Sequence, residues 1–193
     1  MPTATAARGF PGKTPRDPAG AACDTVRMRV VLKLVLDCEP EAAWRAIQSP
    51  TVFREASLPL LAFRSLEDEG FPNRWDEGKH PVRISALGIP LGTQTIGIEL
   101  PERRHEGVQI LRDNGEGITG LNSIFRTWDH RMAIARGPRP GTTLYRDRLR
   151  FDAGPLSAAV WPSLWALWQF RGARLTALAP SWDDAAPAGA AAA

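Results

Sequence analysis

The sequence predicts an α+β protein in which a curved antiparallel sheet of about six to seven strands surrounds one long C-terminal helix. Three observations support this fold class. Segments in which apolar and polar residues alternate follow one another with short turns between them, as neighbouring antiparallel strands do. Two short helical segments follow the first of these strands. The only segment long enough to cover the apolar face of the sheet comes last.

The first predicted strand is Val26–Asp37, whose apolar residues alternate with arginines, a lysine and valines. The next segment predicts a short helix, because Pro40 suits a first helical turn and Ser49-Pro50 ends the apolar stripe. Ser49 can also cap a second short helix at Thr51–Ala56. Further strands are predicted at Leu60–Leu66, Val82–Leu87, Leu91–Leu100 and Val108–Leu111.

The segment Ser123–Phe151 predicts a β-hairpin with one mostly apolar face. Its inward residues are Trp128, His130, Met132 and Ile134 in the first arm and Tyr145, Asp147, Leu149 and Phe151 in the second. The loop 135–142 holds two prolines and two glycines. If it joins neighbouring strands, the expected opposed pairs, each about 5 Å apart at Cβ, are His130 with Asp147, Met132 with Tyr145, and Trp128 with Leu149. A slip of one residue would turn arginines into the core.

His130 and Asp147 therefore form a histidine–carboxylate pair on an apolar face. Two interpretations stay open. The pair is structural if each group only satisfies the hydrogen bond of the other, which is common for a buried histidine. It is catalytic or orients a ligand if the imidazole faces a cavity, where it can act as a general acid or base.

The C-terminal helix is predicted to begin at Pro162 and to run to Ala179, after a helical turn at Leu156–Val160. Trp161, Trp165 and Trp168 lie on or beside its apolar stripe. They either fill the core or line a pocket for a flat ligand, since tryptophan buries a large area. A curved sheet around one helix leaves a gap, which is the predicted ligand site. The apolar run of this helix is too short to span a membrane.

Composition predicts one globular domain. The chain has 193 residues, of which 44% are hydrophobic and 23% charged, and this suits a domain with a sizeable core. We expect the domain at 25–180 and disordered tails at 1–24 and 181–193, because both ends are rich in Ala, Pro and Gly. The first residues lack the apolar run of a secretory signal, so a cytoplasmic location is expected.

Charge and motif content argue against several function classes. The net charge of +3 is dispersed without a dense basic run, which argues against nucleic-acid binding. Cys23 and Cys38 lack metal-ligand spacing, and His80 and His105 lie in predicted turns away from partners, so no metal site is expected. The sequence contains no GxSxG, phosphate-loop, HExxH or GxGxxG motif.

The order of elements over Val26–Ala179 resembles the helix-grip superfamily, which includes the START domains, the Bet v 1-like plant allergen proteins and the polyketide cyclase/dehydrases of the SRPBCC group. The local similarities lie at 38–47, 88–94, Trp128-Asp129-His130, Tyr145-Arg146-Asp147 and 170–175. The resemblance implies a hydrophobic cavity, a small-molecule or lipid ligand and no cofactor. It provides no catalytic motif that can be transferred by position.

The residues expected to contact a ligand are Gln94, Ile96, Trp128, Met132, Tyr145, Leu149, Trp161, Trp165 and Trp168. Gln94 interrupts an apolar strand face, where it either bonds backbone or Trp128 or orients a ligand carbonyl. Glu77 is expected to be an exposed loop acid, with a gating role as the alternative. Asp113 and Glu116 are interpreted as turn residues.

Three functions follow from these patterns. The first is a carrier or sensor that encloses a hydrophobic small molecule or lipid between the sheet and the C-terminal helix. The second is an enzyme of the cyclase/dehydratase kind, in which His130 transfers a proton and Asp147 orients it. The third is a module that contacts a partner or, transiently, a membrane surface through a patch around Trp161–Trp168. The sequence does not predict the oligomeric state.

Overall fold

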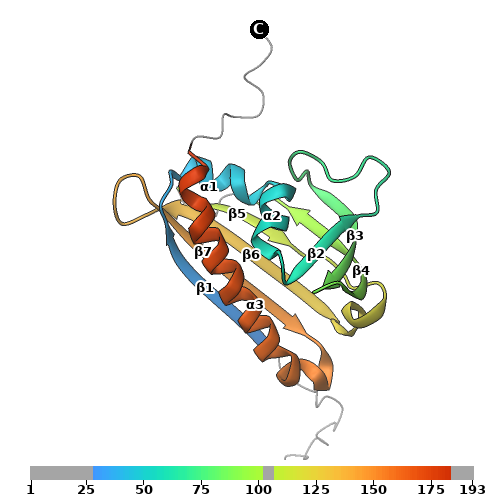
Figure 1. Cartoon of the computed structure of the whole chain (residues 1–193). Helices are drawn as coiled ribbons and strands as arrows, with labels where there is room; N and C mark the ends of the chain where they lie inside the picture. Colours follow the sequence, from blue (N-terminus) through green and yellow to red (C-terminus); the bar gives the residue numbers. More distant parts are fainter. Residues whose placement is uncertain (1–27, 102–106, 184–193) are drawn as a thin grey trace, which may run out of the picture.

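The computed structural model describes residues 28–101 and 107–183. They form one seven-stranded antiparallel sheet with its α-helices on one side (Figure 1). The strands are β1 (Met28–Leu36), β2 (Leu61–Ser65), β3 (Gly78–Ala86), β4 (Ile89–Glu99), β5 (Gln109–Asp113), β6 (Thr127–Arg136) and β7 (Thr143–Asp152). The α-helices are α1 (Pro40–Ile47), α2 (Pro50–Ser57) and α3 (Ser157–Leu178). Short 3₁₀ segments are η1 (Gly120–Ile124), η2 (Gly154–Leu156) and η3 (Ala179–Ser181).

The strand order is β1-β7-β6-β5-β4-β3-β2. The first and second strands thus form the two edges, and α1 and α2 connect them. All other neighbours in the sheet are consecutive in sequence except β1 and β7. This topology confirms the predicted α+β fold, with two short helices after the first strand and a long helix at the C-terminal end.

The alternation of side chains placed the strands correctly because it reflects burial. On β1, Val30, Leu32 and Leu36 are buried, whereas Val31 and Val35 are exposed on the outer face. The predicted cap of the second helix is also confirmed, since the Oγ of Ser49 accepts a hydrogen bond from the backbone N–H of Val52.

The predicted pairing within the β6–β7 hairpin was wrong by two residues. His130 lies opposite Leu149, Met132 opposite Asp147, and Trp128 opposite Phe151. A shift of two residues keeps the same side chains on the inner face, so the burial pattern that excludes a shift of one does not exclude it. His130 and Asp147 are therefore diagonal neighbours.

The long helix starts earlier than predicted. Pro162 does not open α3 but lies inside it, in the second turn after Ser157. Proline lacks the backbone N–H that would bond the residue four positions earlier. Pro162 is exposed, and the helix continues through it to Leu178.

The helix α3 crosses the sheet beside β1 and α2 rather than over its middle. The closest approach is at Gly172, where a Cβ atom would lie 2.8 Å from a terminal methyl group of Leu32. A glycine at this point lets the helix backbone rest directly on β1. The sheet contacts of α3 are therefore mainly with β1, whereas α2 is the helix that contacts β2.

The predicted disordered tail 1–24 lies outside the described residues, as does most of the predicted tail 181–193. Within the described part, Trp182 is buried, and a carboxylate oxygen of Asp183 accepts a hydrogen bond from the backbone N–H of Glu39. The chain therefore packs against α1 for a few residues after α3 ends. In the described residues, no helix is both long enough and apolar enough to cross a membrane.

Candidate functional site

A cavity of about 670 Å³ lies between the inner face of the sheet and the helices α2 and α3. Its walls come from α2, from β2 to β6, from η1 with the following residues, and from one side of α3. Most wall residues are apolar, such as Leu61, Phe63, Ile84, Leu91 and Leu167. The volume falls in the range of ligand sites for small molecules. The gap predicted between helix and sheet is therefore present.

The mouth of the cavity carries apolar side chains in solvent. Leu87 at the β3–β4 turn and Leu121 in η1 both line the cavity, yet they are 71% and 63% exposed. Leu87 also has a φ of 47°, a backbone conformation that side chains with a Cβ rarely adopt. The chain around η1 crosses β4 so closely that a Cβ at Gly92 or Gly120 would collide with backbone.

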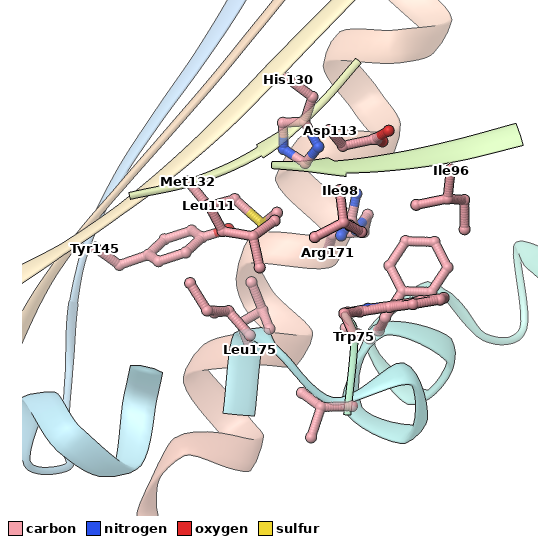
Figure 2. Close-up of a pocket in the computed structure, with 14 residues that line it drawn as sticks. Trp75, Ile96, Ile98, Leu111, Asp113, His130, Met132, Tyr145, Arg171 and Leu175 are labelled. Atoms are coloured by element: carbon pink, nitrogen blue, oxygen red, sulfur yellow. The ribbon is translucent and has the colours of Figure 1, made fainter. Parts of the chain in front are cut away.

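A second, much smaller compartment of about 30 Å³ lies deeper in the molecule, among side chains from α1, α2, the sheet and α3. Figure 2 shows its lining, including Trp75, Ile96, Ile98, Met132 and Tyr145. Four residues border both this compartment and the large cavity: Phe53, Asp113, His130 and Arg171. These four side chains form the inner end of the cavity, which we call the polar partition because three of them carry polar groups.

Asp147 holds a hydrogen-bond cluster behind the polar partition. Its Oδ1 lies 2.8 Å from the Nε2 of His130 and accepts a 2.8 Å hydrogen bond from the Nε1–H of Trp168. Its Oδ2 accepts a 2.8 Å hydrogen bond from the hydroxyl of Tyr145. Asp147, His130 and Tyr145 are each at least 98% buried. The pair predicted from the alternation of residues therefore exists, although its strand register differs.

The surroundings of Asp147 favour its ionised form. Burial alone would raise the pKa of this carboxyl group, but attraction to His130 and the hydrogen bond from its ring outweigh burial. Arg171 and the indole N–H of Trp168 act in the same direction, so the pKa lies below its ordinary value. Burial, followed by the negative charge of Asp147, raises the pKa of Tyr145 well above its usual value. Tyr145 therefore stays protonated and donates to Asp147.

His130 connects this cluster to the cavity. Its Nε2 bonds Asp147, which acts as the acceptor. Its ring lies edge-on to Trp168, with the ring centroids 5.2 Å apart. The imidazole also borders the large cavity, and within the described residues Nδ1 forms no hydrogen bond. Nδ1 is therefore the ring atom that remains for a ligand.

Arg171 is the second polar group of the polar partition. The exposed fraction of the residue is only 9%. Its guanidinium lies between two rings, with its central carbon 5.4 Å from the centroid of Phe53 and 5.4 Å from that of Trp168. These contacts are in the range of cation–π interactions and hold the group at the cavity wall. Its Nε is buried without a hydrogen-bond partner among the described residues.

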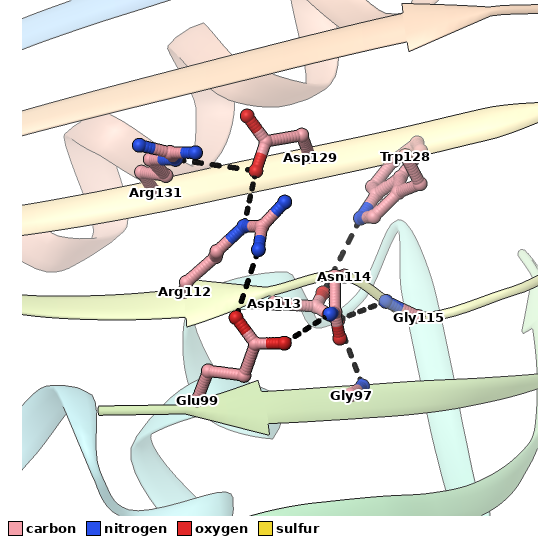
Figure 3. Close-up of polar contacts among 9 residues, drawn as sticks. All are labelled: Gly97, Glu99, Arg112, Asp113, Asn114, Gly115, Trp128, Asp129 and Arg131. Atoms are coloured by element: carbon pink, nitrogen blue, oxygen red, sulfur yellow. Dashed lines mark hydrogen bonds and ion pairs between the residues drawn. The ribbon is translucent and has the colours of Figure 1, made fainter. Parts of the chain in front are cut away.

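Asp113 is the third polar group of the partition and is engaged with its own donors (Figure 3). Its Oδ1 accepts hydrogen bonds of 3.0 Å from the backbone N–H groups of Gly97 and Gly115. Its Oδ2 accepts a 3.3 Å hydrogen bond from the indole N–H of Trp128. These bonds attach the loop after β5 to β4 and fix the ring of Trp128 at the cavity wall.

A separate ionic network lies on the outer face of the sheet and does not reach the cavity. Figure 3 shows Arg112 between Asp129 and Glu99, with Arg131 also bonded to Asp129. Burial raises the pKa of Asp129, but hydrogen bonds from Arg112 and Arg131 and their charges outweigh it, and the pKa is lowered. This network pairs acidic with basic side chains on the outer face of the sheet.

The residues predicted to contact a ligand divide into four groups by position. Gln94, Trp128, His130 and Trp168 line the large cavity. Ile96, Met132 and Tyr145 line the small compartment, which His130 also borders. Asp147 and Leu149 are buried outside both linings. Trp161 and Trp165 do not line either space: their rings stack on each other outside the cavity, where Trp161 donates to the backbone carbonyl of Arg29 and Trp165 is 46% exposed.

Arg171 and Asp113 were not predicted as site residues, although the sequence pattern around each of them indicates burial. Leu164, Trp168, Arg171 and Leu175 form one buried stripe, with the spacing of a helix face. Asp113 was interpreted as a turn residue, yet it continues the inward alternation of Leu111 on β5.

The position of His80 also differs from expectation, whereas Glu77 is exposed as expected. His80 was predicted in a turn away from partners. It is buried on β3, where Nδ1 lies 3.2 Å from a carboxylate oxygen of Glu67 and Nε2 lies 3.1 Å from the carbonyl oxygen of Asp76. Glu77 accepts a 2.8 Å hydrogen bond from the backbone N–H of Leu100, so it ties the bend to the end of β4. His105 lies outside the described residues.

Metal chemistry gains no support from the donor set. Over 28–101 and 107–183, no group of three His, Cys, Asp or Glu side chains is arranged to hold a metal ion. Cys38 is buried behind α1. Burial raises the pKa of its thiol to about 11, while a hydrogen bond with Thr143 lowers it and neighbouring acids add to the rise.

Comparison with known proteins shows the fold alone. No family model matches the chain, and no curated protein matches it. Among solved structures, a point mutant of Thalictrum flavum norcoclaurine synthase in complex with a transition-state analogue has a TM-score of 0.53 at 12% identity, covering 82% of this chain and 97% of that chain. The Ara h 8.0201 structure has a TM-score of 0.53 at 11% identity, covering 80% and 99%.

A third match is protein CV1439 from Chromobacterium violaceum, with a TM-score of 0.53 at 16% identity, covering 78% of this chain and 96% of that chain. The matches span nearly the whole of each solved structure. Together with the strand order and the C-terminal helix, they show that this chain has the helix-grip fold of Bet v 1-like and SRPBCC-type proteins.

Proposed function

We propose that this protein is a carrier or sensor that binds a hydrophobic small molecule or lipid between its sheet and α3. The observation that supports it most directly is the 670 Å³ cavity with mainly apolar walls. Transfer of apolar ligand surface into such a space contributes about 25 cal/mol per Å² before the costs of association. Specificity would come from Gln94, Trp128 and the polar partition at the inner end.

Uptake of Nile red, an uncharged dye whose fluorescence rises in apolar surroundings, tests this proposal. We expect the wild-type protein to bind the dye in the micromolar range and lipid extracts to displace it. Ala86 lines the cavity, and Ala86→Trp should weaken uptake at least tenfold because the indole fills the space. Ala133 lies on the outer face of β6, so Ala133→Trp should bind as the wild type does. Equal uptake by both variants would contradict binding in the cavity.

The position of His130 supports a second candidate function, an enzyme of the cyclase/dehydratase kind. His130 borders the cavity while Asp147 fixes its ring, so Nδ1 can exchange a proton with a bound carbonyl compound. Tyr145 does not suit the role of a carbonyl activator in such an enzyme, because its hydroxyl donates to Asp147 and it lines only the small compartment.

Turnover of β-keto thioesters, followed by mass spectrometry, distinguishes the enzyme from the carrier. The enzyme candidate predicts cyclised or dehydrated product with the wild type and at least a 100-fold lower rate with His130→Asn, while Nile red uptake is retained. Product formation at an unchanged rate in His130→Asn would remove this candidate. Binding of these compounds without product would leave the carrier as the better description.

A further inference from the structure

We propose that the cavity binds an amphipathic carboxylic acid, with the carboxylate on Arg171 at the polar partition and the apolar body extending toward the mouth. This inference rests on the proposed function, since it assigns the ligand class of the same cavity. Arg171 is the only lysine or arginine among the cavity-lining residues of the described chain. Its place at the inner end gives the cavity one charged end and one apolar end.

Arg171 has a full set of donors and no acceptor for them. A guanidinium carries five N–H groups and stays protonated in proteins. In the described part of the chain it forms no side-chain hydrogen bond, no acidic oxygen lies within 4 Å of its nitrogens, and its Nε is buried without a partner. Asp147 attracts Arg171 electrostatically, but a buried cation whose N–H groups have no acceptor is unfavourable, and an anionic ligand would offset that cost.

The two acidic side chains at and behind the polar partition already have hydrogen-bond partners. Asp147 accepts from Trp168 and Tyr145 and is bonded to His130. Asp113 accepts from two backbone N–H groups and from Trp128. Neither carboxylate is free to turn toward Arg171 without breaking these bonds. The cavity that Arg171 lines is therefore the space from which we infer its acceptor comes.

The rings of Phe53 and Trp168 hold the guanidinium in place, which favours a planar, bidentate acceptor. Arginine binds carboxylates and phosphates through two parallel hydrogen bonds. A phosphate monoester would bring close to two negative charges beside Asp113 and Asp147, whereas a carboxylate brings one. His130 borders the same space, and Nδ1 is the ring nitrogen not bonded to Asp147, so Nδ1 is the atom that would bond the second carboxylate oxygen.

Matched ligands that differ only in their head group test the inference. Dodecanoate, dodecanol, methyl dodecanoate and dodecyl phosphate are titrated against the Nile red complex of the full-length protein. We expect dodecanoate to bind about 10- to 100-fold more tightly than the alcohol and the ester, the range given by a charged hydrogen bond. Tighter binding of dodecyl phosphate than of dodecanoate would overturn the assignment of a carboxylate.

Variants of Arg171 localise the effect. Arg171→Met should lose the preference for the acid and bind dodecanol as the wild type does, and Arg171→Lys should keep part of the preference. The control is Arg174→Met, which removes the same charge from α3 at a residue that does not line the cavity and donates to the carbonyl oxygen of Glu55. The control should keep the wild-type preference.

The outcomes separate this inference from the proposed function. If dye, alcohol and ester all fail to bind, the cavity function itself is wrong. If alcohol and ester bind as tightly as the acid, or if Arg171→Met keeps the preference, only the carboxylate inference fails. Should Arg171→Met not fold, the comparison of Arg171→Lys with wild type decides, because a point charge retains attraction but loses the bidentate geometry.

Discussion

At the scale of single residues, Asp147 determines how the polar interior is arranged. It accepts hydrogen bonds from Tyr145 and Trp168 and bonds His130. Its lowered pKa means that it stabilises the folded protein in its ionised form. Such a contribution is complete above the unfolded pKa of about 4 and is lost as the pH falls through the folded pKa.

We expect Asp147→Asn to lower the free energy of unfolding at pH 7 by about 2–4 kcal/mol, because it removes the charge that His130 and Arg171 face in a buried site. The variant should also lose less stability than the wild type between pH 4 and pH 2. Urea unfolding at several pH values measures both effects. Asp129→Asn removes an equivalent charge from the outer face and should cost less. Equal stability of Asp147→Asn and wild type at pH 7 would contradict this role.

Cys38 is expected to be unreactive in the folded protein. Burial, which is opposed by the hydrogen bond with Thr143, raises the pKa of its thiol to about 11, so at pH 8 only about one thiol in a thousand is ionised. In a Cys23→Ser background, a thiol reagent at pH 8 should label no residue in the native state and one residue in urea. Rapid labelling without denaturant would show that α1 opens readily.

At the scale of the elements, the alternation and capping signals located the strands and the first two helices. They did not predict how the elements contact one another. The β6–β7 register shifted by two residues because such a shift leaves every inward side chain inward. Arg171 was missed because an arginine is expected to be exposed, although its position continues the buried stripe of α3. Both errors concern the candidate site, where a polar side chain occupies a position that burial normally reserves for apolar ones.

The contact between α3 and β1 predicts a steric test. Gly172→Val should lower the free energy of unfolding by about 1–3 kcal/mol, because its side chain meets the methyl groups of Leu32. Ala173→Val, on the exposed side of the same helix turn, should cost under about 1 kcal/mol. Combining Gly172→Val with Leu32→Ala should cost less than the sum of the two single changes. Additive effects in chemical denaturation would show that the two residues do not interact.

The outer face of the sheet predicts a salt-dependent effect. Arg148 lies opposite Arg131, and burial, followed by repulsion from Arg150, Arg131 and Arg29, lowers its pKa. Replacing it by glutamine should stabilise the protein by about 0.5–1 kcal/mol, or roughly 1–4 °C, at low ionic strength. The gain should shrink above about 0.5 M salt because repulsion is screened. Arg45→Gln, an equal charge change at an exposed residue of α1, should show no such dependence in thermal unfolding.

At the scale of the whole molecule, the two edges of the sheet are unequally supported. β1 lies under α3, whereas β2 has five residues, pairs only with β3, and forms one wall of the cavity. Stability within one protein varies with the local density of buried contacts. The fold class was predictable because it depends on the order of strands and helices along the chain. The volume of the cavity was not predictable, since it depends on where α3 packs on the sheet.

Hydrogen exchange can measure the inequality of the edges. The β2 amides that bond β3 should exchange at least tenfold faster than the β1 amides that bond β7, because β2 opens without displacing α3. Saturation with dodecanol should slow exchange in β2 and α2 and leave β1 unchanged. Equal protection of both edge strands, or a ligand effect confined to β1, would contradict this description.

The contact of Gly172 with β1 also affects which ligands the cavity can bind. Because α3 packs against β1 at one edge of the sheet, it cannot move away when a wider ligand enters the cavity. Adjustment must come from the opposite wall, where Phe53 of α2 meets Phe63 of β2 with ring centroids 4.6 Å apart. The width of the ligands will therefore be limited by how far β2, which has five residues, and α2, which has eight, can move.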